Sequence, residues 1–288
     1  MGAPHAFTVD LEEWFQGLTS TNRRPAAWPQ LESRVVGATQ MLLALLAEHK
    51  VRATFFVLGH VADHHPALIE RIAAGGHELA IHGYWHRFVT DLTPGEFAEE
   101  VAASSAALRR VTGESPQGHR APYFSINAAT LWALDVLADH GLRYDASVFP
   151  VQNMLYGFAG ASRLPYRTAG DRLWELPTST VEWGGRRWPM AGGFYVRVMP
   201  YAAVRWAVKR LEAAGEPAIM YVHPWELDTG QAVGRVTPRE RVTHYHGRAT
   251  LAGKLDRLLS EFHFGPLRDL VDMLDRKEAT ARPLSPIQ

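Results

Sequence analysis

The chain is predicted to form one parallel α/β domain. Apolar runs of strand length alternate with segments of helical apolar spacing, which is the pattern of a parallel sheet covered by helices. The 288 residues include 47% hydrophobic and 21% charged side chains, which suits a globular protein with a substantial core. Polar side chains gather directly after the predicted strands, where parallel α/β domains place their functional residues.

Strands and helices alternate through the first half of the chain. Short apolar or β-rich runs predict strands over residues 6–10, 53–59, 77–83, 117–122 and 142–148. Helical apolar spacing predicts helices over residues 33–50, 64–76, 92–113 and 127–141. In the third of these helices, Thr93 is a suitable N-cap, Pro94 suits the first helical position, and Gly113 suits the C-terminal cap.

Residues 150–200 interrupt this alternation because they are rich in Gly, Pro and aromatic residues. Within them, residues 172–183 are predicted as antiparallel strand. The remaining elements are a helix over about 200–215, a strand over 218–223 and a helix over about 247–262. We therefore expect a single domain over residues 1–275 with an insert at about 150–200, followed by a flexible tail over 276–288.

The composition excludes several classes of protein. Lys+Arg and Asp+Glu are both 30, so no excess of positive charge suggests a nucleic-acid partner. Without cysteine there are no disulfides, thiolate metal sites or Cys nucleophiles, and any transition metal would be bound by imidazole and carboxylate. The longest apolar run, residues 41–47, is too short to span a bilayer, and the N-terminus does not resemble a signal peptide. We expect a cytoplasmic protein that is not an integral membrane protein; the oligomeric state stays open.

Polar side chains follow several predicted strands. They are Asp10, Glu12 and Glu13 after the first strand, His82 and His86 after the third, then Arg120, Asp145 and His223. If these strand ends meet on one face, two histidines and a carboxylate would form a metal site with open positions. Each residue alone has an ordinary explanation, such as a helix cap, a loop contact or a satisfied core histidine. Their combination in this order favours a metal site.

The same residues lie in motifs that follow one another along the chain. The motifs are TVDLEEWF, HGYWH, RAPYFSI, DASVFP, LWELPTSTV, AGGFYVR and VHPWE. This series resembles the NodB-type polysaccharide deacetylases of carbohydrate esterase family 4, and within them the subgroup associated with exosortase and exopolysaccharide loci. The resemblance covers residues from about 6 to about 270. It implies a distorted (β/α) barrel of about seven parallel strands, and metal-dependent removal of an N-acetyl group from an amino sugar.

The resemblance also implies catalytic roles for individual residues. Asp10 would be the general base, held by Arg120, and His223 would be the general acid. The backbone N–H of Tyr123 would help to bind the oxyanion. Amide hydrolysis independently calls for these groups, because water must lose a proton, the oxyanion needs donors and the leaving amine must gain a proton.

The resemblance gives His82 and His86 as metal ligands, but the third ligand needs a separate argument. The common family pattern has a second acid directly after the first, where this chain has Leu11. Side chains alternate along a strand, so Glu12 shares a face with Asp10 and is predicted to be the third ligand. Glu13 would face the other side and cap the turn that follows. The expected metal is zinc, with cobalt, nickel and manganese as alternatives.

The substrate pocket departs from the family in one respect. DASVFP lacks the Trp that often shapes the acetyl pocket, so the wall is assigned to Phe149, Trp225 or Leu176. In the aromatic insert, Trp183 and Trp188 are candidate sugar platforms, although such rings can equally fill a small core. The other aromatic residues of the insert are Tyr156, Phe158, Tyr166, Trp174, Phe194 and Tyr195. The substrate could be a small N-acetylated glycoside, a lipid-linked oligosaccharide or a polymer.

Two other functions fit part of the pattern. One is a metal-independent or cyclic-amide hydrolase related to allantoinase, and the other is a catalytically idle carbohydrate-binding relative. The idle form is disfavoured by the intact set Asp10, His82, His86, Arg120 and His223. Histidines without a carboxylate partner at a strand end are predicted to be surface or structural residues: His64, His65, His244 and His246.

Overall fold

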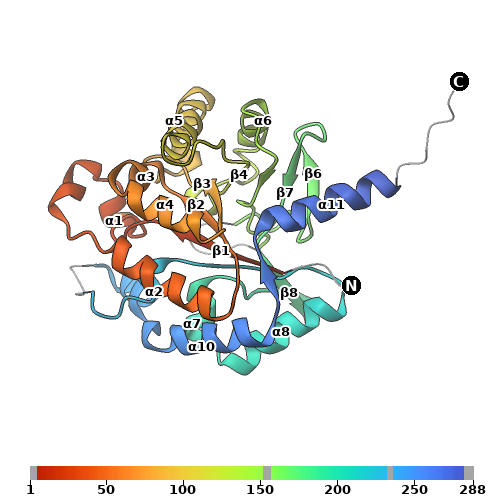
Figure 1. The fold of residues 1–288 in the computed structure, drawn as a ribbon. Helices are drawn as coiled ribbons and strands as arrows, with labels where there is room; N and C mark the ends of the chain where they lie inside the picture. Colours follow the sequence, from red (N-terminus) through yellow and green to blue (C-terminus); the bar gives the residue numbers. More distant parts are fainter. Residues whose placement is uncertain (1–4, 152–156, 232–235, 282–288) are drawn as a thin grey trace, which may run out of the picture.

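A computed structural model describes residues 5–151, 157–231 and 236–281 (Figure 1). Seven parallel strands form a curled sheet in the order β10-β1-β2-β3-β4-β5-β7, which confirms the predicted distorted barrel. Strand β6 is antiparallel to β7, β11 is parallel to β1, and β8 and β9 form a separate hairpin. The strands are β1 His5–Leu11, β2 Thr54–Val57, β3 Glu78–Ile81, β4 Gly118–His119, β5 Tyr144–Asp145, β6 Tyr166–Thr168, β7 Leu173–Glu175, β8 Thr180–Trp183, β9 Arg186–Pro189, β10 Ile219–Val222 and β11 Phe264–Gly265.

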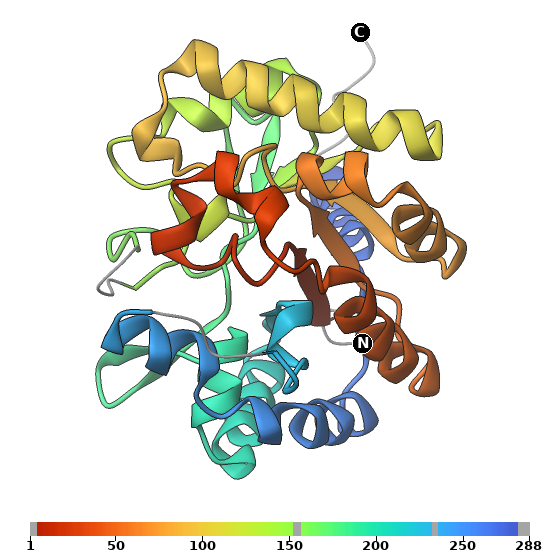
Figure 2. The ribbon, with the colours of Figure 1, turned by 90° about the vertical axis from the view of Figure 1, so that its left-hand side faces the viewer.

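Helices surround this sheet, and Figure 2 views the end at which the parallel strands finish. The α-helices are α1 Thr19–Asn22, α2 Val35–Glu48, α3 Gly59–His64, α4 Pro66–Ala74, α5 Pro94–Thr112, α6 Trp132–Asp139, α7 Gly193–Val198, α8 Tyr201–Ala213, α9 Pro238–Glu240, α10 Arg248–Glu261 and α11 Leu267–Ala281. The other helical turns are η1 Pro25–Gln30, η2 Val89–Asp91, η3 Pro122–Phe124, η4 Pro224–Glu226 and the π-helical η5 Arg241–Tyr245. The predicted caps of α5 are confirmed: the Glu96 N–H donates to Thr93 Oγ1 and Gly113 has a φ of 75°.

Alternation along β1 separates two cores. Phe7, Val9 and Leu11 belong to the large core between the sheet and the helices. Ala6 points into the barrel, where it joins a smaller core closed by Leu270 of α11. The polar side chains on the same face as Ala6 therefore lie inside the barrel, further along the strand.

The barrel is closed by irregular backbone from the insert. Between β7 and β10, the Ser179 N–H donates to the Ile219 carbonyl at 3.4 Å, and the Tyr221 N–H donates to the Ala191 carbonyl at 2.9 Å. These bonds bring the insert against β10. The antiparallel strand predicted over 172–183 is two strands in the structure, with Pro177 in the break between them. The antiparallel pairing is confirmed for β7 with β6 and for β8 with β9, but β7 also pairs in parallel with β5, which the prediction did not include.

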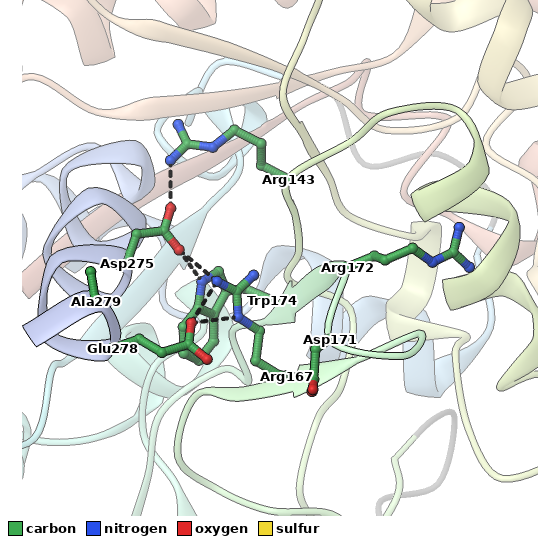
Figure 3. Close-up of a pocket in the computed structure, with 8 residues that line it drawn as sticks. All are labelled: Arg143, Arg167, Asp171, Arg172, Trp174, Asp275, Glu278 and Ala279. Carbon is green, nitrogen blue, oxygen red and sulfur yellow. Dashed lines mark hydrogen bonds and ion pairs between the residues drawn. The ribbon is translucent and has the colours of Figure 1, made fainter. Parts of the chain in front are cut away.

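The prediction of a flexible tail from residue 276 also needs correction, because α11 continues to Ala281. Figure 3 shows the contacts that fix this helix to the sheet. Arg143 bonds to Asp275 at 2.8 Å, Arg167 bonds to both Asp275 and Glu278 at 2.8 Å, and the Trp174 indole donates to Asp275 at 2.8 Å. Tyr156 and residues 282–288 lie outside the described residues.

Candidate active site and metal centre

Strand β1 carries the proposed base into the barrel. Asp10 is buried, and Arg120 Nη1 donates to its Oδ1 at 2.7 Å and to Thr8 Oγ1 at 2.8 Å. Arg120 Nε donates to the Ala146 carbonyl at 3.0 Å, and the guanidinium lies 4.2 Å from the centre of the Phe56 ring. A buried cation fixed by three other partners thus holds Asp10 in one orientation.

Glu12 meets two histidines just beyond the end of β1. Glu12, His82 and His86 each offer one ligand atom, and these atoms lie within 4.8 Å of one another; the described residues contain no second cluster of this kind. His82 Nδ1 lies 2.7 Å from the Arg120 carbonyl, so it donates there and leaves Nε2 facing Glu12. Two imidazoles and one carboxylate are a donor set that fits a divalent transition metal with open positions.

The protonation states also suit a metal centre. Burial opposes ionisation of Glu12, but the His86, His223 and His82 imidazoles outweigh it and hold the pKa of Glu12 below its usual range. Burial lowers the pKa of His82 to about 4. At neutral pH the carboxylate is therefore charged and His82 is neutral, which are the forms that bind metal.

Glu13 faces the opposite side, as predicted. Its carboxylate accepts hydrogen bonds from Ser33 Oγ and, at 3.0 Å, from the backbone N–H of Arg34. Arg34 precedes the first residue of α2, so Glu13 caps the start of that helix. The alternation that separates Glu12 from Glu13 therefore continues past the end of β1.

His223 approaches the site from the end of β10. Its Nε2 lies 3.9 Å from Asp10 Oδ2 and 3.9 Å from Glu12 Oε1, and its Nδ1 lies 3.1 Å from Glu226 Oε2. Burial opposes a charge on His223, but Glu226, Glu12 and Asp10 outweigh it and raise the pKa of His223 to about 9. A protonated imidazole directed at the metal site is suited to give a proton to a leaving group.

Glu226 and Arg197 support His223, and the sequence argument missed both. Arg197 Nε donates to Glu226 Oε1 at 2.8 Å, and the Arg197 Nη2 donates to the Thr243 carbonyl at 2.6 Å. Burial opposes ionisation of Glu226, but Arg197 and His223 outweigh it and lower the pKa of Glu226 to about 2. Two features of the sequence could have indicated these residues. Arg197 is the Arg of the motif AGGFYVR, and Glu226 follows His223 by three positions in the motif VHPWE.

Trp225 acts on the site through Glu12. Its indole N–H donates to Glu12 Oε1 at 3.0 Å, and its rings stack between His223 and His244 with centroid separations of 4.7 and 3.8 Å. It lines the cavity, as predicted for a pocket wall. His244 is buried beside it, and burial lowers the pKa of His244 well below its usual range, so this histidine is a neutral part of the wall.

Three site residues have left-handed backbone conformations. His86, Tyr123 and Phe124 have φ angles of 54°, 55° and 48°. Non-glycine residues in this region are strained, and such residues cluster at functional sites where the surroundings hold them. Here Asn22 donates to the His86 carbonyl at 2.7 Å, and the Tyr123 hydroxyl donates to the Gln16 carbonyl at 2.9 Å.

A cavity of about 720 Å³ opens onto these groups. One wall is aromatic and consists of Phe124, Phe194, Tyr195 and Tyr221. Other lining residues come from α9, η5 and the residue before α9: Thr237, Arg239, Glu240, Val242, Thr243 and His244. Glu240 connects these residues to the segment after β1, because its Oε1 accepts from the Ser20 N–H at 3.0 Å and from Thr19 Oγ1 at 3.1 Å. The cavity therefore joins the first and last thirds of the chain.

The structure does not bring all the predicted substrate residues to this cavity. Phe149 is fully buried in a cluster with Phe124 and Tyr221, and Leu176 belongs to the core inside the barrel. Trp183 and Trp188 lie on the β8–β9 hairpin instead. This corrects their predicted placement: the hairpin leaves the barrel near the start of β10, whereas His223, the proposed general acid, follows its end.

Comparison with known families decides the classification. Residues 30–144 match the family model described as polysaccharide deacetylase, and residues 146–272 match a domain of unknown function, DUF3473. Together with the curated relatives, these matches support a NodB-type polysaccharide deacetylase of carbohydrate esterase family 4. Of the site residues, His82, His86, Arg120 and Tyr123 come from the first matched region, and His223, Trp225 and Glu226 come from the second.

Named relatives agree with this classification. The chain is 39% identical to a chitooligosaccharide deacetylase of Bradyrhizobium over 35% of this chain and 43% of the relative. It is 29% identical to a peptidoglycan-N-acetylglucosamine deacetylase of Bacillus cereus over 47% of this chain and 53% of the relative. The chain thus spans about half the length of the curated relatives it matches.

Solved structures share the fold of this chain. A Mycobacterium smegmatis protein assigned to the polysaccharide deacetylases superposes with a TM-score of 0.66 at 21% identity, covering 99% of this chain and 96% of that one. A family 4 carbohydrate esterase from Streptomyces lividans, solved with acetate, superposes with a TM-score of 0.51 at 18% identity, covering 92% and 93%. At these identities the likeness establishes the fold alone.

Proposed function

We propose that this protein is a metal-dependent hydrolase that removes N-acetyl groups from amino sugars and releases acetate. One observation carries the proposal: the Asp10–Arg120 pair, the cluster of Glu12, His82 and His86, and protonated His223 all face one cavity. The family match and the names of the chitooligosaccharide, chitin and peptidoglycan deacetylases among its relatives support the same reaction.

The residues at the cavity can perform the proton transfers of amide hydrolysis. Glu12, His82 and His86 would hold the metal, which when bound polarises the acetyl carbonyl and makes water more acidic. Asp10, held in place by Arg120, takes a proton from the attacking water as the new C–O bond forms. His223 gives its Nε2 proton to the nitrogen as the C–N bond breaks, so acetate and a free amine leave.

Two details of this function are further proposals: the identity of the metal and the identity of the sugar. Zinc suits two imidazoles and a carboxylate, and cobalt, nickel or manganese could occupy the same donors. The names of the relatives support a substrate that contains N-acetylglucosamine. The aromatic wall of the cavity also suits the apolar C–H faces of a sugar. Whether that sugar belongs to a small glycoside, a lipid-linked oligosaccharide or a polymer stays open, and the cytoplasmic location stays a prediction.

The test is acetate release from a panel of N-acetylglucosamine compounds by the full chain, with metal content measured on the same preparation. We expect acetate release that is lost on chelation and restored by adding zinc or one of its alternatives. Activity in protein free of all four metals would favour the allantoinase-related alternative. No acetate release from any compound by metal-loaded protein would favour the idle relative.

A further inference from the structure

Three tryptophans are exposed together on the side of the barrel. Trp183 and Trp188 lie on the β8–β9 hairpin and Trp206 lies on α8, with exposed fractions of 62%, 46% and 44%. Trp183 contacts both of the others, with ring centroids 6.5 and 6.3 Å apart. Indole rings of this size are seldom left in water as a group, so such a patch marks an interaction surface.

This tryptophan patch is separate from the active site. Ser179, which precedes the hairpin, bonds to Ile219 at the start of β10, whereas His223 follows the end of β10. None of the three tryptophans lines the metal-site cavity. Their function therefore need not involve the reaction.

Cations surround the patch. Arg186 lies directly opposite Trp183 in the hairpin, and the Arg210 guanidinium lies 5.8 Å from the Trp206 ring centre. Lys209 follows Trp206 by three positions on α8, so it lies on the same side of the helix. Within residues 5–151, 157–231 and 236–281, no carboxylate forms an ion pair with any of these three cations.

The one acidic side chain of the hairpin is already engaged. Glu182 lies 3.5 Å from Arg163 and 3.3 Å from Arg187, on the other face of the hairpin from the tryptophans. Glu182 and Glu216 line a surface pocket together with Trp206, Lys209 and Arg210, but both carboxylates pair with Arg163. The patch therefore combines exposed indole rings with cations that have no carboxylate partner among the described residues. It needs a partner that accepts indole rings and carries negative charge.

We propose that this patch binds the surface of an anionic lipid bilayer. Tryptophan favours the boundary between lipid headgroups and acyl chains, and nearby Lys and Arg are attracted by anionic headgroups. A flat sugar platform fits less well, because the ring planes are tilted by 54° and 80° to one another. A symmetric second copy also fits less well, since it would bring unpaired cations close together without a carboxylate between them.

The test is sedimentation of the full chain with vesicles of phosphatidylcholine alone, or of phosphatidylcholine mixed with phosphatidylglycerol. We expect binding to the mixed vesicles, weakened by salt. Trp183→Ser/Trp188→Ser/Trp206→Ser should weaken it roughly 10-fold or more. Arg186→Ser/Lys209→Ser should weaken it roughly 30-fold, at about fivefold per cation. Trp85→Ser, which removes a tryptophan that is 40% exposed elsewhere, is the matched control and should bind normally.

Several outcomes would overturn the proposal. The first is no binding to the mixed vesicles, and the second is equal binding by the triple tryptophan variant and the wild type. The third is retardation of the protein by a soluble glycan, if the triple tryptophan variant loses this retardation and the other variants keep it. Light scattering that shows a dimer dissociated by the triple variant would assign the patch to self-association instead. The triple tryptophan variant and the Arg186/Lys209 variant should keep the wild-type melting temperature, and their deacetylation of a small soluble substrate should be unchanged. Vesicle binding does not depend on activity, so failure of either proposal leaves the other intact.

Discussion

At the scale of single residues, the most informative position is Leu11. It replaces an acid of the common family pattern, and its place in the outer core explains why an apolar residue is suitable there. The period of two along a strand then assigns Glu12 to the inside of the barrel and Glu13 to the outside. The contacts of both side chains agree with that assignment. This part of the site could be predicted because strand geometry alone determines it.

Metal analysis separates the two adjacent acids. Glu12→Ala removes a donor from the cluster with His82 and His86, so bound metal and activity should both be lost. Glu13→Ala should keep both, and should cost about 1 kcal/mol of stability because α2 loses its cap. Metal content by mass spectrometry and thermal unfolding measure these effects. Retention of metal by Glu12→Ala together with loss by Glu13→Ala would reverse the assignment.

The base has its own test. Asp10→Asn keeps the shape of the side chain and an acceptor for Arg120, but the amide cannot take a proton from water. We expect turnover to fall roughly 10²-fold or more while metal content stays the same. Steady-state kinetics and metal analysis of one preparation check this. Turnover close to that of the wild type would show that another group is the base.

At the scale of elements, the sequence predicted the regular strands and helices better than the segments that shape the site. Apolar periodicity located β1, β2, β3, β10 and α5 because each has a face in a core. β9, α9 and η5 carry no such pattern, whereas β8 falls within the strand predicted over 172–183. Their positions depend on distant contacts, such as that of Ser20 with Glu240, which spacing along the chain cannot show.

The turn after β10 also predicts a pH dependence. The raised pKa of His223, about 9, depends in part on Glu226. A general acid must be protonated, so kcat/KM should fall as the pH rises through about 9. Glu226→Gln removes the negative partner, which lowers the pKa of His223 and should move this decline to lower pH. A complete pH profile for each protein measures the shift.

The stability of the fold should also decrease as the pH rises. The pKa of His223 in the folded state lies above its ordinary value of about 6.5, so the protonated imidazole stabilises the fold at low pH. That contribution is lost as the pH rises through about 9.

In the pH profiles of activity, Glu13→Gln changes another buried carboxylate without touching His223 and serves as the control. A decline in activity at the same pH in Glu226→Gln and wild type would contradict the role given to Glu226.

At the scale of the whole molecule, the site exists only when distant parts of the chain are folded together. The metal cluster joins β1 to the segment after β3, and the acid arrives more than 200 residues after the base in the sequence, from Asp10 to His223. Helix α11 closes the other end of the barrel and is tied to β7 through Asp275 and Trp174. The unfolded chain therefore has no preformed metal site, and metal binding is linked to folding.

This linkage gives a prediction for the intact protein that does not depend on knowing the substrate. A metal present at about 100 times its Kd should add about 2.7 kcal/mol to the free energy of unfolding. For a chain of 288 residues, that corresponds to a rise in Tm of roughly 4–5 °C. Thermal unfolding of chelated protein and of protein titrated with zinc, cobalt, nickel or manganese measures the rise and ranks the metals. Glu12→Ala should show little of this rise and Glu13→Ala should show all of it. An equal rise in Glu12→Ala would mean that the stabilising metal binds outside the cluster of Glu12, His82 and His86. Metal held by those three side chains requires β1 and the end of β3 to be folded together, and Glu12→Ala removes one of the three ligands.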